Sequence, residues 1–302
     1  MNKPTPILIA GPTASGKSSL ALRLAQETGG AVINADSQQI YAGWRILSAR
    51  PPEAEEARAP HYLYGHVPMD AVYSAGHWLR DVETVLAECA AKGLRPILVG
   101  GTGLYFKALT EGLAPIPEVP ATVRDASEAL LAELGREAFA ASFAARDPQT
   151  AAQIDMANPR RIQRAWEVLE ATGTGLAAWQ AQTPPPLLPL SKCTAIALTP
   201  ERDRVYAQCE TRLDQMIAKG ALEEARNVME MNLPPLAPSL KAVGAPELMA
   251  HLRGAMTLEA ATDLAKTETR RYAKRQMTWI RNQMAAWEKV VDPDAALEQL
   301  LG

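Results

Sequence analysis

The sequence has no apolar run long enough to cross a lipid bilayer, because a spanning helix needs roughly 20 consecutive apolar residues and the apolar runs of this chain are much shorter. Its first residues also contain no long apolar stretch followed by a small-residue cleavage site. We therefore expect no membrane segment and no secretory signal, and we expect the protein in the cytoplasm.

Cysteine and histidine are scarce, with three and four residues among 302. The cysteines are far apart and form no CxxC pair, which excludes a disulfide framework and a cysteine-based zinc site. The histidines lack the spacing of metal ligands, so we expect them to pack or to be exposed. These residues are Cys89, Cys193, Cys209, His61, His66, His77 and His251.

The chain also lacks a basic excess, since its formal net charge is −3, which alone argues against a nucleic-acid partner. The charge is, however, distributed unevenly along the chain. Between Lys266 and Arg281 six basic residues stand with one acid, Glu268, so the segment is locally +5. On a helix the basic residues share one face, and Tyr272, Trp279 and Ile280 share the other. The basic face is either a solvated surface or a phosphate-contacting one. It consists of Lys266, Arg270, Arg271, Lys274, Arg275 and Arg281.

The segment GPTASGKS satisfies the pattern GxxxxGK[ST], directly after the apolar run ILIA and before a helical pattern. Its amides and the helix N-terminus favour an anion, Lys17 adds a point charge, and Ser18 is a candidate magnesium ligand. The segment therefore predicts a phosphate-binding loop. It contains Gly11, Pro12, Thr13, Ala14, Ser15, Gly16, Lys17 and Ser18.

Two features of hydrolysing nucleotide triphosphatases are missing. The best candidate for a second core strand ends in GGTG (100–103) instead of a magnesium-holding Asp, and there is no NKxD segment for reading guanine. These absences favour transfer chemistry, in which the loop holds either a transferred phosphate or a departing diphosphate.

Two polar residues follow predicted strands. Asp36 comes just after the second strand, where it would hold magnesium, accept a proton from a nucleophile, or cap a helix. Thr102 follows the third strand, where it would orient a reacting group or a phosphate oxygen, or cap the helix beginning near Leu104. The aromatic residues of YSAGHW (73–78) would line a pocket or pack in the core.

Alternating strands and helices predict an α/β fold: a P-loop NTPase-like parallel sheet with flanking helices, plus an all-helical insertion domain. We expect strands at 7–10, 31–36, 95–101 and 192–200. Proline-rich segments bound a stretch without strand patterning. The expected parts are 1–116 (first part of the core), 117–190 (helical insertion, binding tRNA by the resemblance below) and 191–302 (second part of the core, with basic C-terminal helices).

Several segments together resemble the tRNA dimethylallyltransferase (isopentenyltransferase) family, bacterial type, nearly from end to end. The resemblance implies transfer of a dimethylallyl group from dimethylallyl diphosphate to the exocyclic amine N6 of the adenosine immediately 3′ of the anticodon, with Mg²⁺ as cofactor and release of diphosphate. The segments are GPTASGKS, ADSQQIY, SARPP, YSAGHW, LVGGTGLYFKAL, NPRRIQRAWEVLEATG and TRRYAKRQMTWIRNQ.

The resemblance also implies roles for residues. Asp36 matches a general base, Thr102 lies beside the reacting base, and Lys17 and Arg212 contact diphosphate. Residues 11–18 bind diphosphate, with Ser18 at the metal. The tRNA-binding positions are Asp36, Ser37, Gln38, Gln39, Thr102, Arg124, Arg160, Arg161, Ile162, Gln163, Arg164, Lys241, Ala242, Val243, Gly244, Ala245 and Pro246.

This chain departs from the family pattern at VGAPEL (243–248), where many members have Gly-Tyr-Lys/Arg-Glu, and it has no cysteine after Cys209 to build a zinc finger. The expected partners are the tRNA anticodon stem-loop and dimethylallyl diphosphate, for a monomer without membrane contact. Two other readings share the loop and Asp36: a small-molecule or nucleotide kinase that uses ATP, and a non-catalytic RNA-binding module.

Overall fold

A computed structural model describes residues 4–302 of the chain, in two compact units. Unit 1 comprises the described residues up to Thr110 together with Leu187–Gly302, and unit 2 comprises Glu111–Pro186. The helical insertion therefore begins six residues before the predicted position 117 and ends four residues before 190. The prolines that mark these boundaries in the sequence lie inside the connecting segments.

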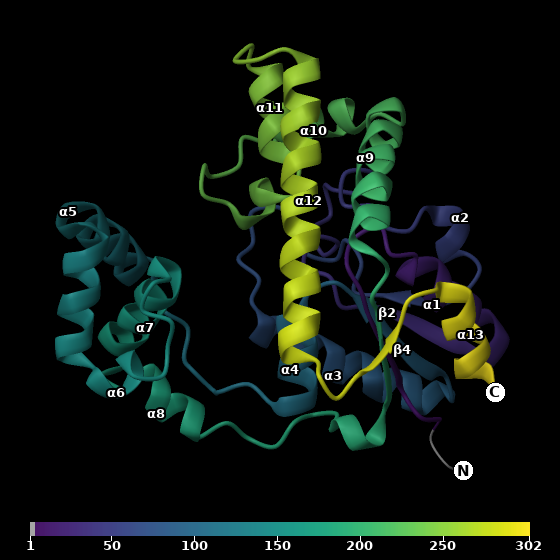
Figure 1. The fold of residues 1–302 in the computed structure, drawn as a ribbon, viewed down its shortest axis with the longest axis horizontal. Coiled ribbons are helices and arrows are strands. Elements are labelled where there is room, and N and C mark those ends of the chain that lie inside the picture. The colour runs from purple at the N-terminus through teal and green to yellow at the C-terminus, as the bar shows by residue number, and fades with distance from the viewer. Residues whose placement is uncertain (1–3) are drawn as a thin grey trace. The chain divides into compact units, whose positions relative to one another are not determined.

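Unit 1 contains a six-stranded sheet in the order β3-β2-β4-β1-β5-β6, and all neighbouring strands are parallel (Figure 1). The four predicted strands are present. The two edge strands β3 and β6 were not predicted, and β6 lies where only helices were expected. The strands are β1 Ile7–Ala10, β2 Gly30–Asn34, β3 His61–Tyr62, β4 Arg95–Gly100, β5 Thr194–Leu198 and β6 Glu288–Val290.

Helices cover both faces of the sheet, so its central strands are fully buried, as parallel sheets require. One face packs on α3 and α4 and on the end of α12, and the other packs on α1 and α13. The helices of unit 1 are α1 Lys17–Thr28, α2 Glu53–Glu56, α3 Ala75–Lys92, α4 Gly103–Glu111, α9 Arg202–Ala218, α10 Ala221–Glu230, α11 Ala245–Leu252, α12 Leu258–Gln283 and α13 Pro293–Leu301, with 3₁₀ turns at Leu190–Lys192 and Pro238–Lys241.

A third core cluster lies outside the sheet. It joins the segment after β2, from Ile40 to Leu47, with the buried faces of α9, α10, α11 and α12. In Figure 1 α12 is the long helix beside α11 and α9, both of which it contacts. This cluster holds the segment after β2 against these four helices. None of the helices formed by residues 4–302 is long and apolar enough to span a membrane.

Unit 2 is entirely helical in its regular structure, as predicted. Its elements are α5 Ala121–Arg146, α6 Pro148–Ala151, α7 Pro159–Thr172 and α8 Leu176–Ala181. Gly135 (φ 73°, ψ 170°) breaks the helical conformation inside α5. Phe139 and Phe143 of α5 pack on Ile162 and Trp166 of α7, so the unit has its own small core.

Candidate active site

The strand order places one crevice at the centre of the sheet. The connection after β1 leads to β2 on one side of the sheet, and the connection after β4 leads to β5 on the other side. The direction of the connections therefore reverses between the neighbouring strands β1 and β4. In open α/β sheets, ligands bind at the carboxyl ends of the strands beside such a reversal. Here those ends carry the phosphate-binding loop after β1, Asp36 after β2, and Thr102 after β4.

The loop from Gly11 to Gly16 turns directly into α1. Gly16 precedes the helix in a left-handed conformation (φ 84°), which is open to glycine at little cost. The first-turn amides of α1 have no partner within the helix and favour an anion at its N-terminus. The Ser15 hydroxyl is buried without a hydrogen-bond partner among the described residues. The Thr13 amide differs from these groups, because it donates to Oε1 of Gln276 at 2.8 Å.

Lys17 and Arg212 bring two positive charges to the start of α1. The Lys17 ammonium is buried and donates to the carbonyl of Pro12 at 3.2 Å. The pKa of Lys17 is lowered to about 8, mainly by burial; Asp36 and Cys209 act against this shift, and Arg212 adds to it. Burial also lowers the pKa of Arg212. Two positive charges at the edge of one cavity favour a multivalent anion.

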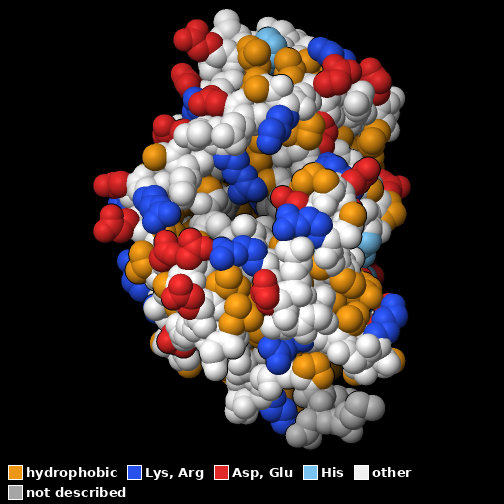
Figure 2. Space-filling model, turned by 90° about the vertical axis from the view of Figure 1, so that its right-hand side faces the viewer, with side chains coloured by type: hydrophobic (Ala, Val, Ile, Leu, Met, Phe, Trp, Pro, Cys, Tyr) orange, Lys and Arg blue, Asp and Glu red, His pale blue; other side chains and the backbone are white. Residues whose placement is uncertain are grey.

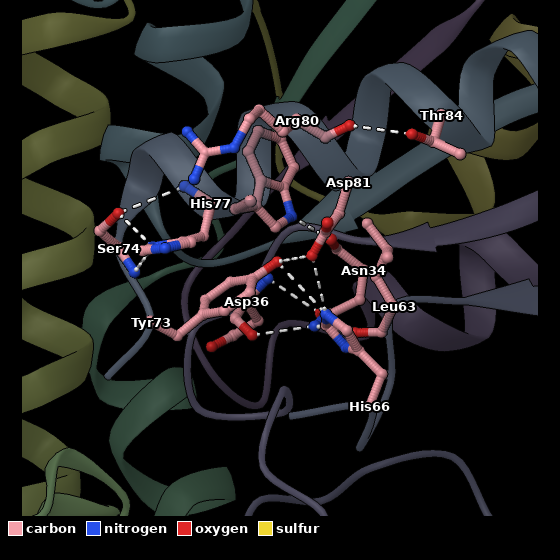
Figure 3. Close-up of polar contacts among 11 residues, drawn as sticks. Asn34, Asp36, Leu63, His66, Tyr73, Ser74, His77, Arg80, Asp81 and Thr84 are labelled. Carbon is pink, nitrogen blue, oxygen red and sulfur yellow. Dashed lines mark hydrogen bonds and ion pairs between the residues drawn. The ribbon is translucent and has the colours of Figure 1, made fainter. Parts of the chain in front are cut away.

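Asp36 is buried and held by its neighbours in the turn after β2. Its Oδ1 accepts the amide of Gln38 at 3.0 Å, and its own amide donates to Oδ1 of Asn34 at 2.9 Å. The side-chain amide of Asn34 donates in turn to the carbonyls of Asp36 (3.0 Å) and Leu63 (2.9 Å), as Figure 3 shows. Oδ2 of Asp36 accepts no hydrogen bond from residues 4–302, so this oxygen is open to a substrate.

Thr102 joins the end of β4 to the segment that contains Asp36. Its hydroxyl accepts the amide of Ser37 at 2.8 Å and donates to the Ser37 hydroxyl at 3.1 Å, and its own amide donates to the Ala35 carbonyl at 3.2 Å. The Thr102 side chain also lies beside the Tyr272 phenol of α12. Burial, with Asp36 adding to it, raises the pKa of Tyr272 well above its ordinary value, so this phenol stays protonated.

Two hollows meet at Lys17, Ser18 and Arg212, which line both. The first is a cavity of about 60 Å³ with a polar end at Asp36 and an apolar wall of Leu47, Leu213, Met216 and Val243. The second is a groove of about 470 Å³ between the start of α1 and α9, lined by Ala14, Ser15, Gly16, Ser19, Ala207, Gln208, Thr211 and Gln215 in addition to the shared three. On the face with α1 and α9, Figure 2 shows a hollow bordered by basic side chains.

The side chains of Gln38 and Gln39 hold the walls of the cavity. Oε1 of Gln38 accepts the Val243 amide at 3.1 Å, in the segment 241–246. Nε2 of the buried Gln39 donates to the carbonyls of Ser48 (3.0 Å) and Ala49 (2.8 Å). Their expected contact with tRNA stays a prediction, but both side chains already have backbone partners.

The segment 241–246 contributes one wall residue and a helix start. Val243 lines the cavity, and Gly244 precedes α11 in a left-handed conformation. Ala242, Gly244 and Ala245 are buried, whereas Lys241 and Pro246 are exposed. Only the two exposed residues and Val243 have side chains placed to meet a ligand.

In unit 2 the predicted RNA-contacting residues divide by burial. Arg160, Arg161 and Arg164 are exposed on α7, and Arg124 is partly exposed on α5. Ile162 and Gln163 are buried, which corrects the prediction for their side chains: they pack inside the unit and do not face a partner. The physical reason is helical spacing, because both lie on the face of α7 that contacts α5.

The aromatic residues of YSAGHW (73–78) were predicted either to line a pocket or to pack in the core, and the structure favours packing. Trp78 is fully buried, donates to the Asn34 carbonyl at 2.8 Å and stacks on Tyr105. The Tyr73 hydroxyl donates to Asp81 at 2.6 Å, with His66 beside them (Figure 3). The described residues contain no group of three or more His, Cys, Asp or Glu side chains arranged for a metal.

Two residues of α12 belong to the site but were not predicted as site residues from the sequence. Tyr272 lines the cavity, and Gln276 contacts the phosphate-binding loop. Both lie opposite the basic face, four residues apart, and this spacing is the signal that sequence reasoning had available.

On the basic face, Lys266 and Arg270 pair with Asp214 and Glu210 of α9, and Arg271 pairs with Glu268. Lys274, Arg275 and Arg281 form no ion pair within residues 4–302.

The residues present suit a magnesium ion bound together with a polyphosphate. The partly exposed Ser18 hydroxyl stands at the helix start, and the Asp36 carboxylate lines the same cavity. Mg²⁺ usually takes one or two protein ligands and completes its octahedron with phosphate oxygens and water. The small donor set of this site is what such an ion requires.

The fold and the site define an α/β protein with a P-loop beside a buried carboxylate. Residues 39–283 match the family described as IPP transferase. The chain belongs to this family, so the resemblance stated from its sequence is confirmed.

Curated relatives and solved structures agree. A tRNA dimethylallyltransferase of Cereibacter sphaeroides (strain KD131) is 56% identical over 285 residues, 94% of this chain and 88% of the relative. One of Ruegeria sp. (strain TM1040) is 55% identical over 286 residues, 94% and 95% of the two chains. The full-length tRNA isopentenylpyrophosphate transferase of Bacillus halodurans superposes with a TM-score of 0.70 at 31% identity, covering 99% of this chain and 94% of that one. A eukaryotic dimethylallyltransferase acting on tRNA gives a TM-score of 0.77 at 26% identity, covering 94% and 71%.

Proposed function

We propose that this protein transfers the dimethylallyl group of dimethylallyl diphosphate to N6 of the adenosine immediately 3′ of the anticodon in tRNA. tRNA prenylation is the activity in the names of its relatives. The observation that carries the proposal is that two cations, the buried Lys17 and the partly exposed Arg212, line one cavity together with the Asp36 carboxylate. The two cations suit a leaving diphosphate, and the carboxylate suits an attacking amine.

The phosphate-binding loop would act on the leaving group. As the bond between the allylic carbon and the diphosphate oxygen breaks, negative charge grows on the diphosphate. The first-turn amides of α1, Lys17 and Arg212 would stabilise that charge from fixed positions. When bound at Ser18, Mg²⁺ supplies further positive charge to the diphosphate. The apolar wall formed by Leu47, Leu213, Met216 and Val243 would receive the five-carbon chain.

Asp36 would act on the nucleophile. The adenine must leave its stack before its amine can reach a carbon inside the protein. N6 forms the new bond to the allylic carbon and its proton passes to the free Oδ2 of Asp36. The Gln38 amide holds Oδ1 of the carboxylate, and Asn34 holds the Asp36 backbone. Thr102, fixed by Ser37 and Tyr272, would orient the base.

The tRNA anticodon stem-loop would be held mainly through its phosphates, since these dominate affinity for nucleic acid. Lys274, Arg275 and Arg281 of α12 are available for such contacts, as are Arg160, Arg161 and Arg164 of α7 and Arg124 of α5. We further propose that the protein acts as a monomer in the cytoplasm. The kinase reading is not favoured by the relatives described above, which are named as dimethylallyl or isopentenyl transferases acting on tRNA.

One labelling experiment tests the proposal. The protein is incubated with unmodified tRNA, magnesium and radiolabelled dimethylallyl diphosphate in the absence of ATP. We expect label in the RNA, at the adenosine 3′ of the anticodon after nuclease digestion. ATP-dependent phosphorylation of a small metabolite would instead support a kinase, and RNA binding without turnover would support a non-catalytic module.

A further inference from the structure

Gln276 connects two loops that the mechanism above treats separately. Its side chain is buried on α12. Oε1 accepts the amide of Thr13 in the phosphate-binding loop at 2.8 Å, and Nε2 donates to the carbonyl of Gly101 in the loop after β4 at 3.1 Å. One side chain thus bridges the carboxyl ends of β1 and β4, which border the central crevice of the sheet.

The face of α12 that carries Gln276 lies tightly against the loop after β4. A Cβ atom placed on Gly101 would stand 2.0 Å from Nε2 of Gln276, and one on Gly103 would stand 2.0 Å from the Trp279 indole. One turn earlier on the same face, the Tyr272 phenol lies beside the Thr102 side chain. Three side chains at i, i+4 and i+7 therefore follow the loop from 101 to 103.

We propose that Gln276 is a positioning residue that keeps the diphosphate-binding loop in register with the pair formed by Asp36 and Thr102. The proposal rests on the proposed function, because the register matters when one group holds the leaving diphosphate and the other receives a proton. Gln276 touches neither substrate in this arrangement. It acts through Thr13 and Gly101.

The physical argument concerns distance and amide orientation. Transfer requires the allylic carbon and the amine to approach within about 3–3.5 Å, and misplacement by about 1 Å costs on the order of 10²-fold in rate. The hydrogen bond to Gln276 also turns the Thr13 amide away from the anion, which leaves the first-turn amides of α1 to bind it. Without Gln276, Thr13 would regain an unpaired donor and the two loops would lose their shared partner.

The test compares Gln276→Met with a matched control, Gln283→Met, at an exposed position on the same helix. Methionine keeps the length of the side chain and removes both hydrogen bonds. We expect kcat for prenyl transfer to fall about 10- to 100-fold in Q276M, while Kd for inorganic pyrophosphate by calorimetry and Kd for unmodified tRNA by filter binding change less than about threefold. Q283M should match the wild-type protein in all three.

A second variant gives a readout that a packing role would not move. Gln276→Glu keeps an acceptor for Thr13, but its ionised carboxylate cannot donate to the Gly101 carbonyl. Protonation restores the donor, so kcat of Q276E relative to wild type should rise as the pH is lowered from 8 to 6.

Wild-type kcat in Q276M would overturn the proposal. A second set of results would also overturn it, because it would indicate a packing role. In that set, Q276M binds pyrophosphate more weakly and melts at a lower temperature, in proportion to its loss of kcat, and the kcat of Q276E relative to wild type does not change with pH. Absence of transfer by the wild-type protein would instead refute the proposed function, so the two failures are distinguishable.

Discussion

Lys17 is placed where burial and a neighbouring cation both oppose its charge. Its pKa is lowered to about 8, first by burial and then by Arg212, although Asp36 and Cys209 act in the opposite direction. At pH 7 the ammonium is therefore charged, and it becomes neutral as the pH rises through about 8. A bound diphosphate would raise this pKa again, because an anion favours the charged form.

This linkage predicts a pH dependence of anion binding. Since the bound form of Lys17 holds its proton more tightly than the free form, affinity for inorganic pyrophosphate should fall as the pH rises above about 8, with proton uptake on binding. Lys17→Met removes the charge, and pyrophosphate binding should weaken by about tenfold or more at pH 7. Calorimetry in buffers of different ionisation enthalpy measures both effects.

Pyrophosphate itself also changes its protonation in this pH range. The K17M variant serves as the reference, because the titration of pyrophosphate affects both proteins equally. The ratio of the wild-type affinity to the K17M affinity should decrease between pH 7 and 9.5. A constant ratio would show that Lys17 does not titrate in the site.

Asp36 supports a second prediction at this scale. Asp36→Asn keeps the size of the side chain and an acceptor for the Gln38 amide, but it removes the proton acceptor. General-base assistance is typically about 10²–10⁴-fold, so kcat for prenyl transfer should fall by that range while the affinity for unmodified tRNA stays within about threefold. Asp70→Asn, at an exposed position after β3, is the control. Transfer at the wild-type rate in D36N would remove Asp36 from the mechanism.

Residues with a fixed relation to a strand end are those that the sequence made predictable. Asp36 and Thr102 come within two residues of a strand end, and Lys17 belongs to the loop motif that starts directly after β1. Parallel strands bring such positions together. Gln276 and Tyr272 follow no such rule, because their positions depend on how α12 packs against the strand ends. Gln276 is 263 residues from Thr13 along the chain, and Tyr272 is 170 residues from Thr102. The distinction between exposed Arg160 and buried Gln163 likewise depends on which face of α7 meets α5.

At the scale of elements, α10 fixes the segment that walls the cavity. The Glu224 carboxylate accepts three successive backbone amides, those of Arg45 (2.6 Å), Ile46 (2.8 Å) and Leu47 (2.8 Å). Three amides pointing at one carboxylate form a small anion nest occupied by the chain itself. The hold on Leu47 positions part of the apolar wall of the cavity.

This contact predicts an asymmetry between neighbouring glutamates. Glu224→Ala leaves three amides without their charged acceptor, so the free energy of unfolding should fall by about 2–4 kcal/mol. KM for dimethylallyl diphosphate should also rise. Glu223→Ala removes only an exposed ion pair with Arg226 and should cost less than about 0.5 kcal/mol. Urea unfolding measures both variants, and equal losses would contradict the nest.

The elements that sequence reasoning missed are the short ones. β3 has two residues and β6 has three, and neither is long enough to show a periodicity. Each forms because a neighbouring strand offers an unpaired edge: β3 pairs with β2, and β6 pairs with β5. Pairing of this kind is a tertiary contact, whereas the buried runs of β1, β2, β4 and β5 are visible in the sequence itself.

At the scale of the whole molecule, the chain builds its two units with separate hydrophobic cores. The clusters around the sheet and around α9 to α12 contain residues of unit 1 alone, and the cluster of Phe139, Phe143, Ile162 and Trp166 contains residues of unit 2 alone. The proposed chemistry lies in unit 1, because Lys17, Asp36, Thr102 and Arg212 all belong to it. Unit 2 contributes exposed arginines and no residue of the cavity.

The connection between the units makes this division testable. In unit 1 the Leu188 amide donates to the Leu109 carbonyl at 3.0 Å, so the chain leaves and re-enters this unit at neighbouring points. Replacing residues 111–186 by a short glycine-rich linker should therefore leave the sheet and its helices folded, since closing a short loop costs little entropy. We expect Kd for inorganic pyrophosphate within about threefold of the wild-type value and prenyl transfer to tRNA reduced more than about 100-fold, since the arginines of α7 would be missing.

A point variant separates loss of unit 2 from damage caused by the excision. Phe143→Ala empties the core of unit 2, where such a truncation costs about 3–5 kcal/mol. It should reduce transfer and tRNA affinity while pyrophosphate binding stays unchanged, in the same direction as the excised protein. If the excised protein modified tRNA at the wild-type rate, unit 2 would have no part in RNA binding, and the basic face of α12 would have to supply the phosphate contacts alone.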